Sequence, residues 1–143
     1  MAWGKERNAE SQAELEARPE VKELHPRLLD IYNSRERIPS VARRGEWLYN
    51  FWQDAANPRG LWRRTTMAEY RMKDPAWEVV LDIGKLSAAE SQQWVFKGAR
   101  CLFPDYKRCL VSLSRGGADA VTEREFDIPA GEFVKDGFVL EES

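Results

Sequence analysis

The chain has 143 residues, of which 43% are hydrophobic, so it holds enough apolar material for one packed domain and is not a disordered protein. Its 22 basic and 24 acidic residues give a formal net charge of −2, which provides no overall field to attract nucleic acid or an anionic membrane. No apolar run is long enough to cross a bilayer, and Met1–Glu10 has no signal-peptide core, so we expect a cytoplasmic location.

Two helices are expected first, over Asn8–Ala17 and Pro19–Asn33. The second has an apolar stripe at helical spacing, formed by Val21, Leu24, Leu28 and Ile31. Pro26 lies within this segment, and we expect it to kink or break the helix after Leu24 because proline removes a backbone donor. Arg35–Val41 is then expected to be a polar hinge.

After the hinge, the periodicity becomes that of β-strands. Glu46–Trp52 has aromatic residues on both of its alternating faces, which is typical of a strand covered on both sides. Leu61–Met67 and Trp77–Ile83 are the next two expected strands, the first of them entered through a turn at Asn57–Gly60. Gly84–Gln93 is expected to hold a helical turn.

The stretch Lys97–Val134 is typical of a β-meander. Its apolar runs continue slightly beyond it, and they are Ala99–Phe103, Cys109–Leu113, Val121–Ile128 and Phe133–Leu140. The segments between these runs contain the turn-forming residues Pro104, Gly116, Gly117 and Gly131. Four short strands at roughly ten-residue spacing indicate one blade of a β-propeller.

The strand-rich part contains two such units in succession, at about Val41–Ile83 and Trp94–Leu140. The expected fold is therefore mainly β with N-terminal helices: a partial β-propeller of about two blades, each a four-stranded antiparallel meander. We expect a helical segment at 1–36 and a partial propeller at 37–143, divided into blades at 37–90 and 91–143. Two blades alone leave two outer faces uncovered. If about 500 Å² of apolar surface stays exposed there, the chain lacks roughly 12 kcal/mol of stabilisation that burial would provide.

No serine in this sequence has the surroundings of a hydrolase nucleophile. Such a serine requires Gly-x-Ser-x-Gly, and Ser114 precedes Gly116 but has Ser112 where the first glycine is needed. The triad order also requires a histidine after the serine, whereas the single histidine, His25, lies near the N-terminus and is interpreted as a surface or capping residue. We expect no catalytic, cofactor-binding or metal-binding residues in this chain.

Two further patterns have a structural and a functional interpretation. Glu123, Glu125 and Asp127 alternate on one strand face, and a solvated face is preferred over an acid–base pair. Gly116-Gly117 is interpreted as a turn, because a phosphate loop requires a helix directly after its glycines and a strand is expected here.

Cys101 and Cys109 flank an expected hairpin turn. A disulfide between them is geometrically possible, but two buried thiols are preferred because the cytoplasm is reducing.

A basic cluster is interleaved with tryptophans in the first strand-rich unit. It consists of Arg43, Arg44, Arg59, Arg63 and Arg64, with Trp47, Trp52 and Trp62. Arginine beside aromatic residues can bind single-stranded nucleic acid by charge and stacking. Arginine stems also pack on aromatic faces in ordinary cores, and the near-neutral total charge favours this interpretation. We expect neither nucleic acid nor a membrane as a partner, and an RNA-binding module remains the weakest alternative.

Three groups of residues together resemble the N-terminal part of a prolyl oligopeptidase. They are Trp3 with Asn8-Ala9; Arg37-Ile38-Pro39 leading to Tyr49–Trp52 and Pro58–Thr66; and Trp77–Asp82 with Cys109–Asp127. In that family, a seven-bladed propeller covers an α/β-hydrolase domain that carries a Ser-Asp-His triad. The resemblance implies that this chain supplies the N-terminal helices and the first two blades, and that both of its ends are cuts.

The resemblance implies an N-terminal fragment of a serine-type endopeptidase, a hydrolase, that helps to gate substrates and is not catalytic alone. Its partners would be the missing propeller blades and the hydrolase domain, with short peptides as substrates of the parent protein and self-association as a further possibility. The alternative is an independent β-rich module that recruits a protein partner through its aromatic strand faces.

Overall fold

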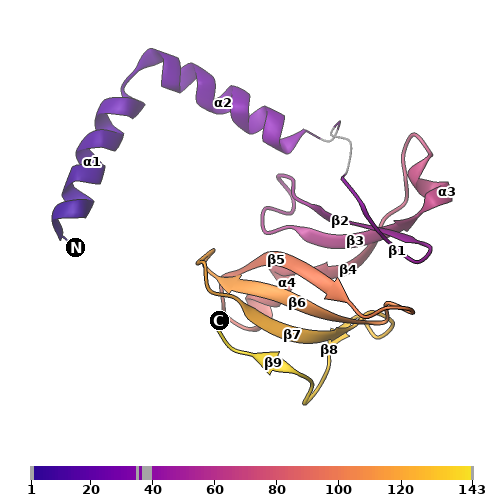
Figure 1. Ribbon diagram of the computed structural model, residues 1–143. Helices are drawn as coiled ribbons and strands as arrows, with labels where there is room; N and C mark the ends of the chain where they lie inside the picture. Colours follow the sequence, from indigo (N-terminus) through magenta and orange to yellow (C-terminus); the bar gives the residue numbers. More distant parts are fainter. Residues whose placement is uncertain (1, 35, 37–39, 143) are drawn as a thin grey trace. The chain divides into compact units, whose positions relative to one another are not determined.

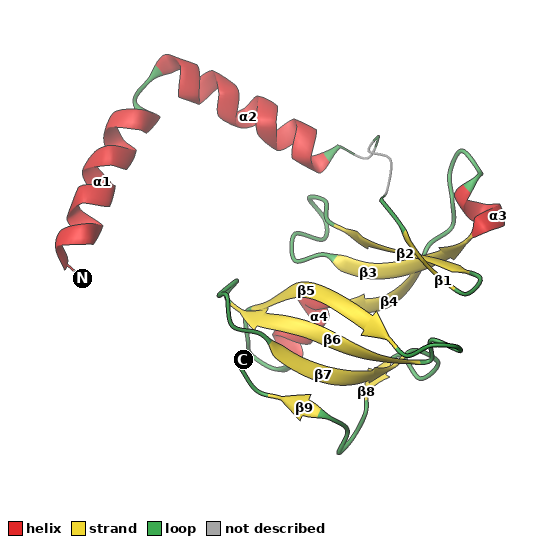
Figure 2. Cartoon of the chain, in the orientation of Figure 1, coloured by secondary structure: helices red, strands yellow, loops and turns green. Residues whose placement is uncertain are grey.

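The computed structural model describes residues 2–34, 36 and 40–142. The chain divides into two compact units, Met1–Arg37 and Ile38–Ser143, the first helical and the second rich in strands (Figures 1 and 2). Most of the expected hinge, and the Arg37-Ile38-Pro39 motif, lie outside the described residues.

The helical unit consists of α1, Ala2–Glu16, and α2, Pro19–Asn33. Both helices are confirmed, although α1 begins at Ala2 rather than Asn8. Of the two expected outcomes at Pro26, a kink or a break, the break is wrong, because α2 continues through this residue. Proline removes only one helical N–H bond, and the residues on both sides keep the helical conformation.

Neither helix of this unit has a buried residue. The apolar stripe of α2 is open to solvent, with Leu24 50%, Leu28 43% and Ile31 59% exposed. Within residues 2–34, 36 and 40–142, no helix combines the length and the apolar character that crossing a bilayer requires.

The first sheet is an antiparallel meander of four strands in chain order. Its strands are β1, Ala42–Arg44; β2, Trp47–Trp52; β3, Leu61–Thr66; and β4, Glu78–Asp82. Two short helices follow strands of this sheet: α3, Met67–Tyr70, after β3, and α4, Ile83–Ala89, after β4. The Asp82 carboxylate accepts a hydrogen bond of 3.0 Å from the Lys85 N–H and so caps α4. The helical turn expected after the third apolar run is therefore confirmed.

The second sheet has five antiparallel strands, of which the first four are paired in chain order. Its strands are β5, Trp94–Cys101; β6, Arg108–Arg115; β7, Thr122–Asp127; β8, Glu132–Phe133; and β9, Val139–Leu140. The expectation of a single last strand is wrong, because β8 and β9 are separate and both pair with β7.

The interruption of the last strand has a local cause. Asp136 adopts a φ of 58°, and the Gly137 N–H donates to the Val134 carbonyl at 3.1 Å, so the chain turns out of the sheet. Glu125 bonds both sides of the turn, donating its N–H to Phe138 and accepting from Val134, each at 2.9 Å. The edge thus keeps its pairing on both sides of a bulge.

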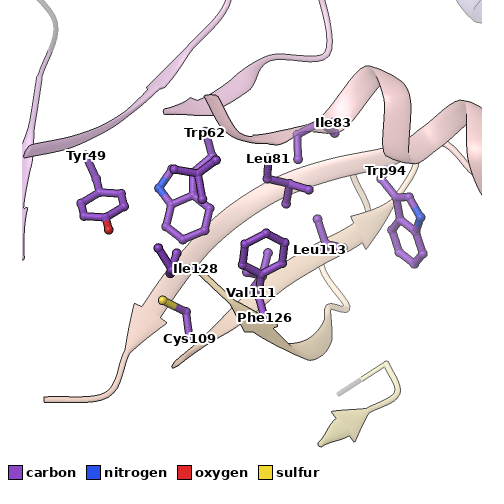
Figure 3. Packing of buried hydrophobic residues seen from close by; sticks show 11 residues of the cluster. Tyr49, Trp62, Leu81, Ile83, Trp94, Cys109, Val111, Leu113, Phe126 and Ile128 are labelled. Carbon is purple, nitrogen blue, oxygen red and sulfur yellow. The ribbon is translucent and has the colours of Figure 1, made fainter. Parts of the chain in front are cut away.

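The two sheets share one hydrophobic core. Tyr49, Trp62 and Leu81 of the first sheet and Val111, Leu113 and Phe126 of the second are all less than 10% exposed (Figure 3). Trp62 is central, with its ring centroid 5.5 Å from that of Tyr49 and 6.0 Å from that of Phe126. These offset and edge-on aromatic pairs stabilise the packing of one sheet on the other.

The outer face of the first sheet is partly covered, and that of the second carries polar residues. On the first sheet, Leu48 and Thr65 point away from the core, yet they are only 3% and 2% exposed. The Thr65 hydroxyl donates to the Ala76 carbonyl at 2.6 Å, which holds the loop between β3 and β4 against the sheet. The outer face of the second sheet has polar residues in cross-strand register, such as Ser112 opposite Glu123.

Candidate functional site

The arginine and tryptophan cluster lies on the first sheet but is divided between its two faces. Directly opposed residues share a face, so the pairs Arg44–Trp47 and Tyr49–Arg64 define the face toward the second sheet. The pair Asn50–Arg63 defines the opposite face. The residues of this cluster therefore do not form one continuous basic surface.

On the inner face, Arg64 is held by partners on both sides. Its guanidinium carbon lies 4.2 Å from the Trp47 ring centroid, and its Nη2 lies 2.7 Å from the Glu78 carboxylate. Burial acts to lower the pKa of Arg64, but the hydrogen bonds and charge of Glu78, together with Tyr49, outweigh burial and raise it. Arg64 therefore has a structural role that needs no ligand.

On the outer face, Arg63 lies between two indole rings. Its guanidinium carbon is 4.4 Å from the Trp52 centroid and 4.3 Å from the Trp77 centroid, and its Nε donates to Asn50 Oδ1 at 2.8 Å. Burial lowers the pKa of Arg63 to about 10, against the opposing effect of Asp54. The expectation that these arginines pack on aromatic faces is confirmed.

Arg44 differs from both of these residues. Its Nη2 donates to the Ala99 carbonyl of β5 at 2.6 Å, and its guanidinium carbon lies 5.0 Å from the Tyr49 centroid. Burial lowers the pKa of Arg44, with Tyr49 and Tyr106 acting in the opposite direction. In the described part of the chain, no carboxylate lies within ion-pair distance of this side chain, which spans the gap between the two sheets.

Arg44 lines a cleft of about 350 Å³ at one end of the two sheets. The first sheet contributes Arg44, Gly45, Glu46, Trp47, Tyr49 and Arg64, and the second contributes Pro104, Asp105, Tyr106, Lys107, Ile128 and Pro129. Two of these residues, Tyr49 and Ile128, also belong to the buried cluster drawn in Figure 3. This cleft is the candidate binding site of the chain.

The three acidic residues of β7 lie on one face, as expected, and each has a structural partner. Glu123 accepts from the Ser112 hydroxyl at 2.7 Å, and Glu125 and Asp127 lie 3.5 and 3.1 Å from Arg108. Among the residues that the structure describes, no three His, Cys, Asp or Glu side chains are grouped as metal ligands. The arrangement is that of a hydrogen-bonded sheet surface.

The remaining sequence candidates are placed apart from this cleft. Gly116 and Gly117 have φ of 62° and 84° and lie between two strands, so the turn interpretation is confirmed. Ser114 is within β6 and 1% exposed, and its hydroxyl has no hydrogen-bond partner in the described part of the chain. His25 is exposed in the middle of α2.

The cysteine pair differs from the preferred expectation. Cys101 and Cys109 are directly opposed in β5 and β6 and form a disulfide rather than two thiols. The register of the hairpin brings the two residues together, and the sequence could not provide this register because the turn residues allow several loop lengths.

Sequence reasoning missed the cleft itself. Arg44 belonged to a recognised cluster, but the other wall comes from the turn after β5, some 60 residues later. The available signal was the alternation that puts Arg44, Trp47 and Tyr49 on one face of adjacent strands.

Comparison with known proteins gives consistent matches. Residues 1–142 match the family model described as the N-terminal beta-propeller domain of prolyl oligopeptidase. The chain is 46% identical over 144 residues to an uncharacterized peptidase of Sinorhizobium fredii, covering 99% of this chain and 20% of that protein. It is 37% identical over 139 residues to an uncharacterized peptidase of Rickettsia prowazekii, covering 96% of this chain and 19% of that protein.

Solved structures show the same similarity. A post-proline cleaving enzyme from Rickettsia typhi matches with a TM-score of 0.88 and 36% identity, covering 96% of this chain and 20% of that one. A structure from a study of two prolyl endopeptidases matches with a TM-score of 0.69 over 98% of this chain, at 17% identity, and so shows the fold alone. The chain spans about a fifth of the length of these relatives.

Proposed function

This chain belongs to the prolyl oligopeptidase family, in its N-terminal β-propeller domain, and from this premise we propose that it forms part of a substrate gate in a larger serine peptidase. The expected fold, a partial β-propeller preceded by helices, is confirmed. The observation that carries the proposal is a pair of consecutive antiparallel sheets that share one hydrophobic core. The chain that contains them aligns with about a fifth of the length of much longer peptidases.

We assign residues 1–36 to a helical segment, 37–90 to a first blade and 91–143 to a second blade. The stacking of the two sheets through Trp62 and Phe126 supports the two-blade assignment. In a propeller, each further blade packs on the outer face of the last, so a closed ring would restrict entry to short, flexible peptides. The open stripe of α2 is proposed to dock on the remainder of the parent protein.

The chain is proposed to have no hydrolytic activity alone. In support, Ser112 hydrogen-bonds to Glu123, Ser114 is buried within a strand, and neither lies in the strand-to-helix turn that a hydrolase serine requires. The parent protein is proposed to cleave proline-containing peptides with residues that lie elsewhere.

The first test measures hydrolysis and gating together. We expect the purified chain to leave a proline-containing chromogenic peptide intact, while the full-length Rickettsia typhi enzyme cleaves it. A chimera that carries this chain in place of the matched fifth of that enzyme should cleave the short peptide and spare a folded protein. Turnover by the isolated chain, abolished by one substitution within it, would refute the non-catalytic role, and a chimera that digests folded protein would refute the gating role.

The alternative is an independent protein-interaction module. One observation favours it: the loop between β3 and β4 is held against the outer face of the first sheet, which the last blade of a closed ring would otherwise cover. Light scattering separates the two functions, since a module is a monomer or a closed dimer at high concentration, whereas a fragment self-associates further or needs the rest of its parent protein.

The cytoplasmic location expected from the sequence stays a proposal. The cytoplasm keeps most thiols reduced, so the Cys101–Cys109 disulfide is the observation that weighs against this location.

A further inference from the structure

Arg44 is the cation of the cleft for which the described residues form no ion pair. The other two cations of the lining are paired, Arg64 with Glu78 at 2.7 Å and Lys107 with Asp105 at 4.0 Å. For Arg44, the described residues provide one hydrogen bond, to a neutral backbone carbonyl, and no ion pair. A guanidinium has five N–H donors, so most of those of Arg44 remain available.

The position of Arg44 makes this charge unfavourable without an anion. The side chain is half-buried between the two sheets, and its guanidinium lies over the Tyr49 ring. Removing a charge from water costs free energy, and pairing with an opposite charge together with hydrogen bonds offsets that cost more fully than the ring contact with Tyr49 alone. An anion that entered the cleft would supply both of these interactions.

The walls of the cleft restrict what else the ligand contains. Beside Arg44 they present the rings of Trp47, Tyr49 and Tyr106, together with Pro104, Pro129 and Ile128. Small-molecule sites typically combine such apolar walls with a few polar groups that orient the ligand. The volume of about 350 Å³ admits a small apolar ring or side chain next to the anionic group.

The charges of the lining favour an anion with one negative charge over an anion with two. Glu46 and Asp105 also line the cleft, and Arg44 is its one cation without an acidic partner in the described residues. A phosphate, which carries nearly two negative charges, would be repelled by these carboxylates. A carboxylate carries one charge and matches the planar guanidinium with two parallel hydrogen bonds.

We propose that the cleft between the two sheets binds the free carboxylate of a short peptide, with Arg44 pairing the carboxylate and the aromatic walls holding the last side chain. The identification of a peptide as the source rests on the proposed function, whereas the carboxylate site rests on the geometry of this chain. The site lies between the first two sheets, where every lining residue belongs to this chain.

The test measures binding to the full chain by titration calorimetry with three probes. They are N-acetyl-alanyl-proline with a free carboxylate, the same peptide as its amide, and benzoate. We expect the free acid to bind at least about tenfold more tightly than the amide, because charged hydrogen bonds are lost in the amide. Equal binding of acid and amide, or no binding of either acid, overturns the site.

Benzoate separates the site from the proposed function. If benzoate binds and the peptide acid does not, the carboxylate site is supported and the peptide assignment is overturned. If both acids bind, both parts of the proposal are supported.

Substitutions locate the binding. Arg44→Gln should weaken binding of the peptide acid at least about tenfold. Arg44→Lys keeps the positive charge but loses the two parallel N–H donors of the guanidinium, so it should give an intermediate affinity. Arg43→Gln is the matched control, since Arg43 is the preceding residue, exposed, and on the other face of β1. The proposal is overturned if circular dichroism shows that Arg44→Gln is folded and the variant binds the peptide acid as tightly as the unchanged chain does. If Arg44→Gln does not fold, the proposal is decided by the affinity of Arg44→Lys for the peptide acid and by the comparison of peptide acid with peptide amide on the unchanged chain.

Discussion

At the scale of single residues, the arginines of the first sheet show how one residue type takes different roles by position. Arg63 and Arg64 are neighbours in β3, so their side chains project from opposite faces. Arg64 gains a carboxylate partner, whereas Arg63 relies on two indoles and the Asn50 amide. Both are structural, which leaves Arg44 as the arginine of this cluster proposed to bind a ligand.

Arg63→Ala should destabilise the chain by about 2 kcal/mol, because two cation–π contacts are lost and the buried Asn50 amide loses a donor. The measurement is the free energy of unfolding in urea. Arg59→Ala is the control, since Arg59 makes no hydrogen bond, ion pair or ring contact in the described part of the chain, and a change below about 0.5 kcal/mol is expected. Equal effects of the two substitutions would contradict the role given to Arg63.

At the scale of elements, the turns decide how the strands meet. Gly60, just before β3, has a φ of 93°, and a Cβ atom at this position would lie against the ring of Phe51. The turn therefore requires glycine for two reasons, the backbone conformation and the close approach of an aromatic side chain. Gly131, between β7 and β8, requires it only for its φ of 71°, because no atom lies near its missing Cβ.

Gly60→Ala should lower the free energy of unfolding by about 3 kcal/mol or more, because the strained φ and the clash with Phe51 act together. Gly131→Ala should lower it by about 1 kcal/mol, because only the strained φ acts there. Thermal unfolding monitored by far-ultraviolet circular dichroism measures both variants. If Gly131→Ala were the more harmful of the two, the explanation by steric contact would be wrong.

At the scale of the whole molecule, the strand-rich unit depends on contacts between its two sheets. Phe126 is fully buried and contacts Trp62 of the first sheet and Phe133 of its own. The core is built from residues of both sheets, so the buried face of each sheet becomes exposed when the other sheet unfolds. The two meanders are therefore expected to unfold as one cooperative unit.

Phe126→Ala should lower the free energy of unfolding by about 3 to 5 kcal/mol and lower the stability of both sheets together. Native-state hydrogen exchange measures this, with amides of β3 and β6 followed separately. Phe103→Ala is the control, since Phe103 is 74% exposed, and it should change the stability little. Loss of protection in β6 with β3 unaffected would show that the sheets are independent.

Local patterns in the sequence provided the element types, the two meanders and the family resemblance. Alternating aromatic residues in Trp47–Trp52 and the glycines of the turns are short-range signals, so they can be interpreted without coordinates. The continuity of α2 through Pro26 and the split of β8 from β9 were decided by competing local hydrogen bonds, whose balance the pattern does not contain. The predictions were wrong at these two places and at Cys101 and Cys109, which form a disulfide.

The sequence by itself determined that this is a strand-rich chain with N-terminal helices, because periodicity and turn chemistry act over a few residues. Only the tertiary structure decided the register that joins Cys101 to Cys109, the loop that Thr65 holds against the first sheet, and the cleft that Arg44 and Tyr106 both line. The physical reason is that these features depend on which strand faces pack together, and residues distant in the sequence meet only when the two sheets close on their common core.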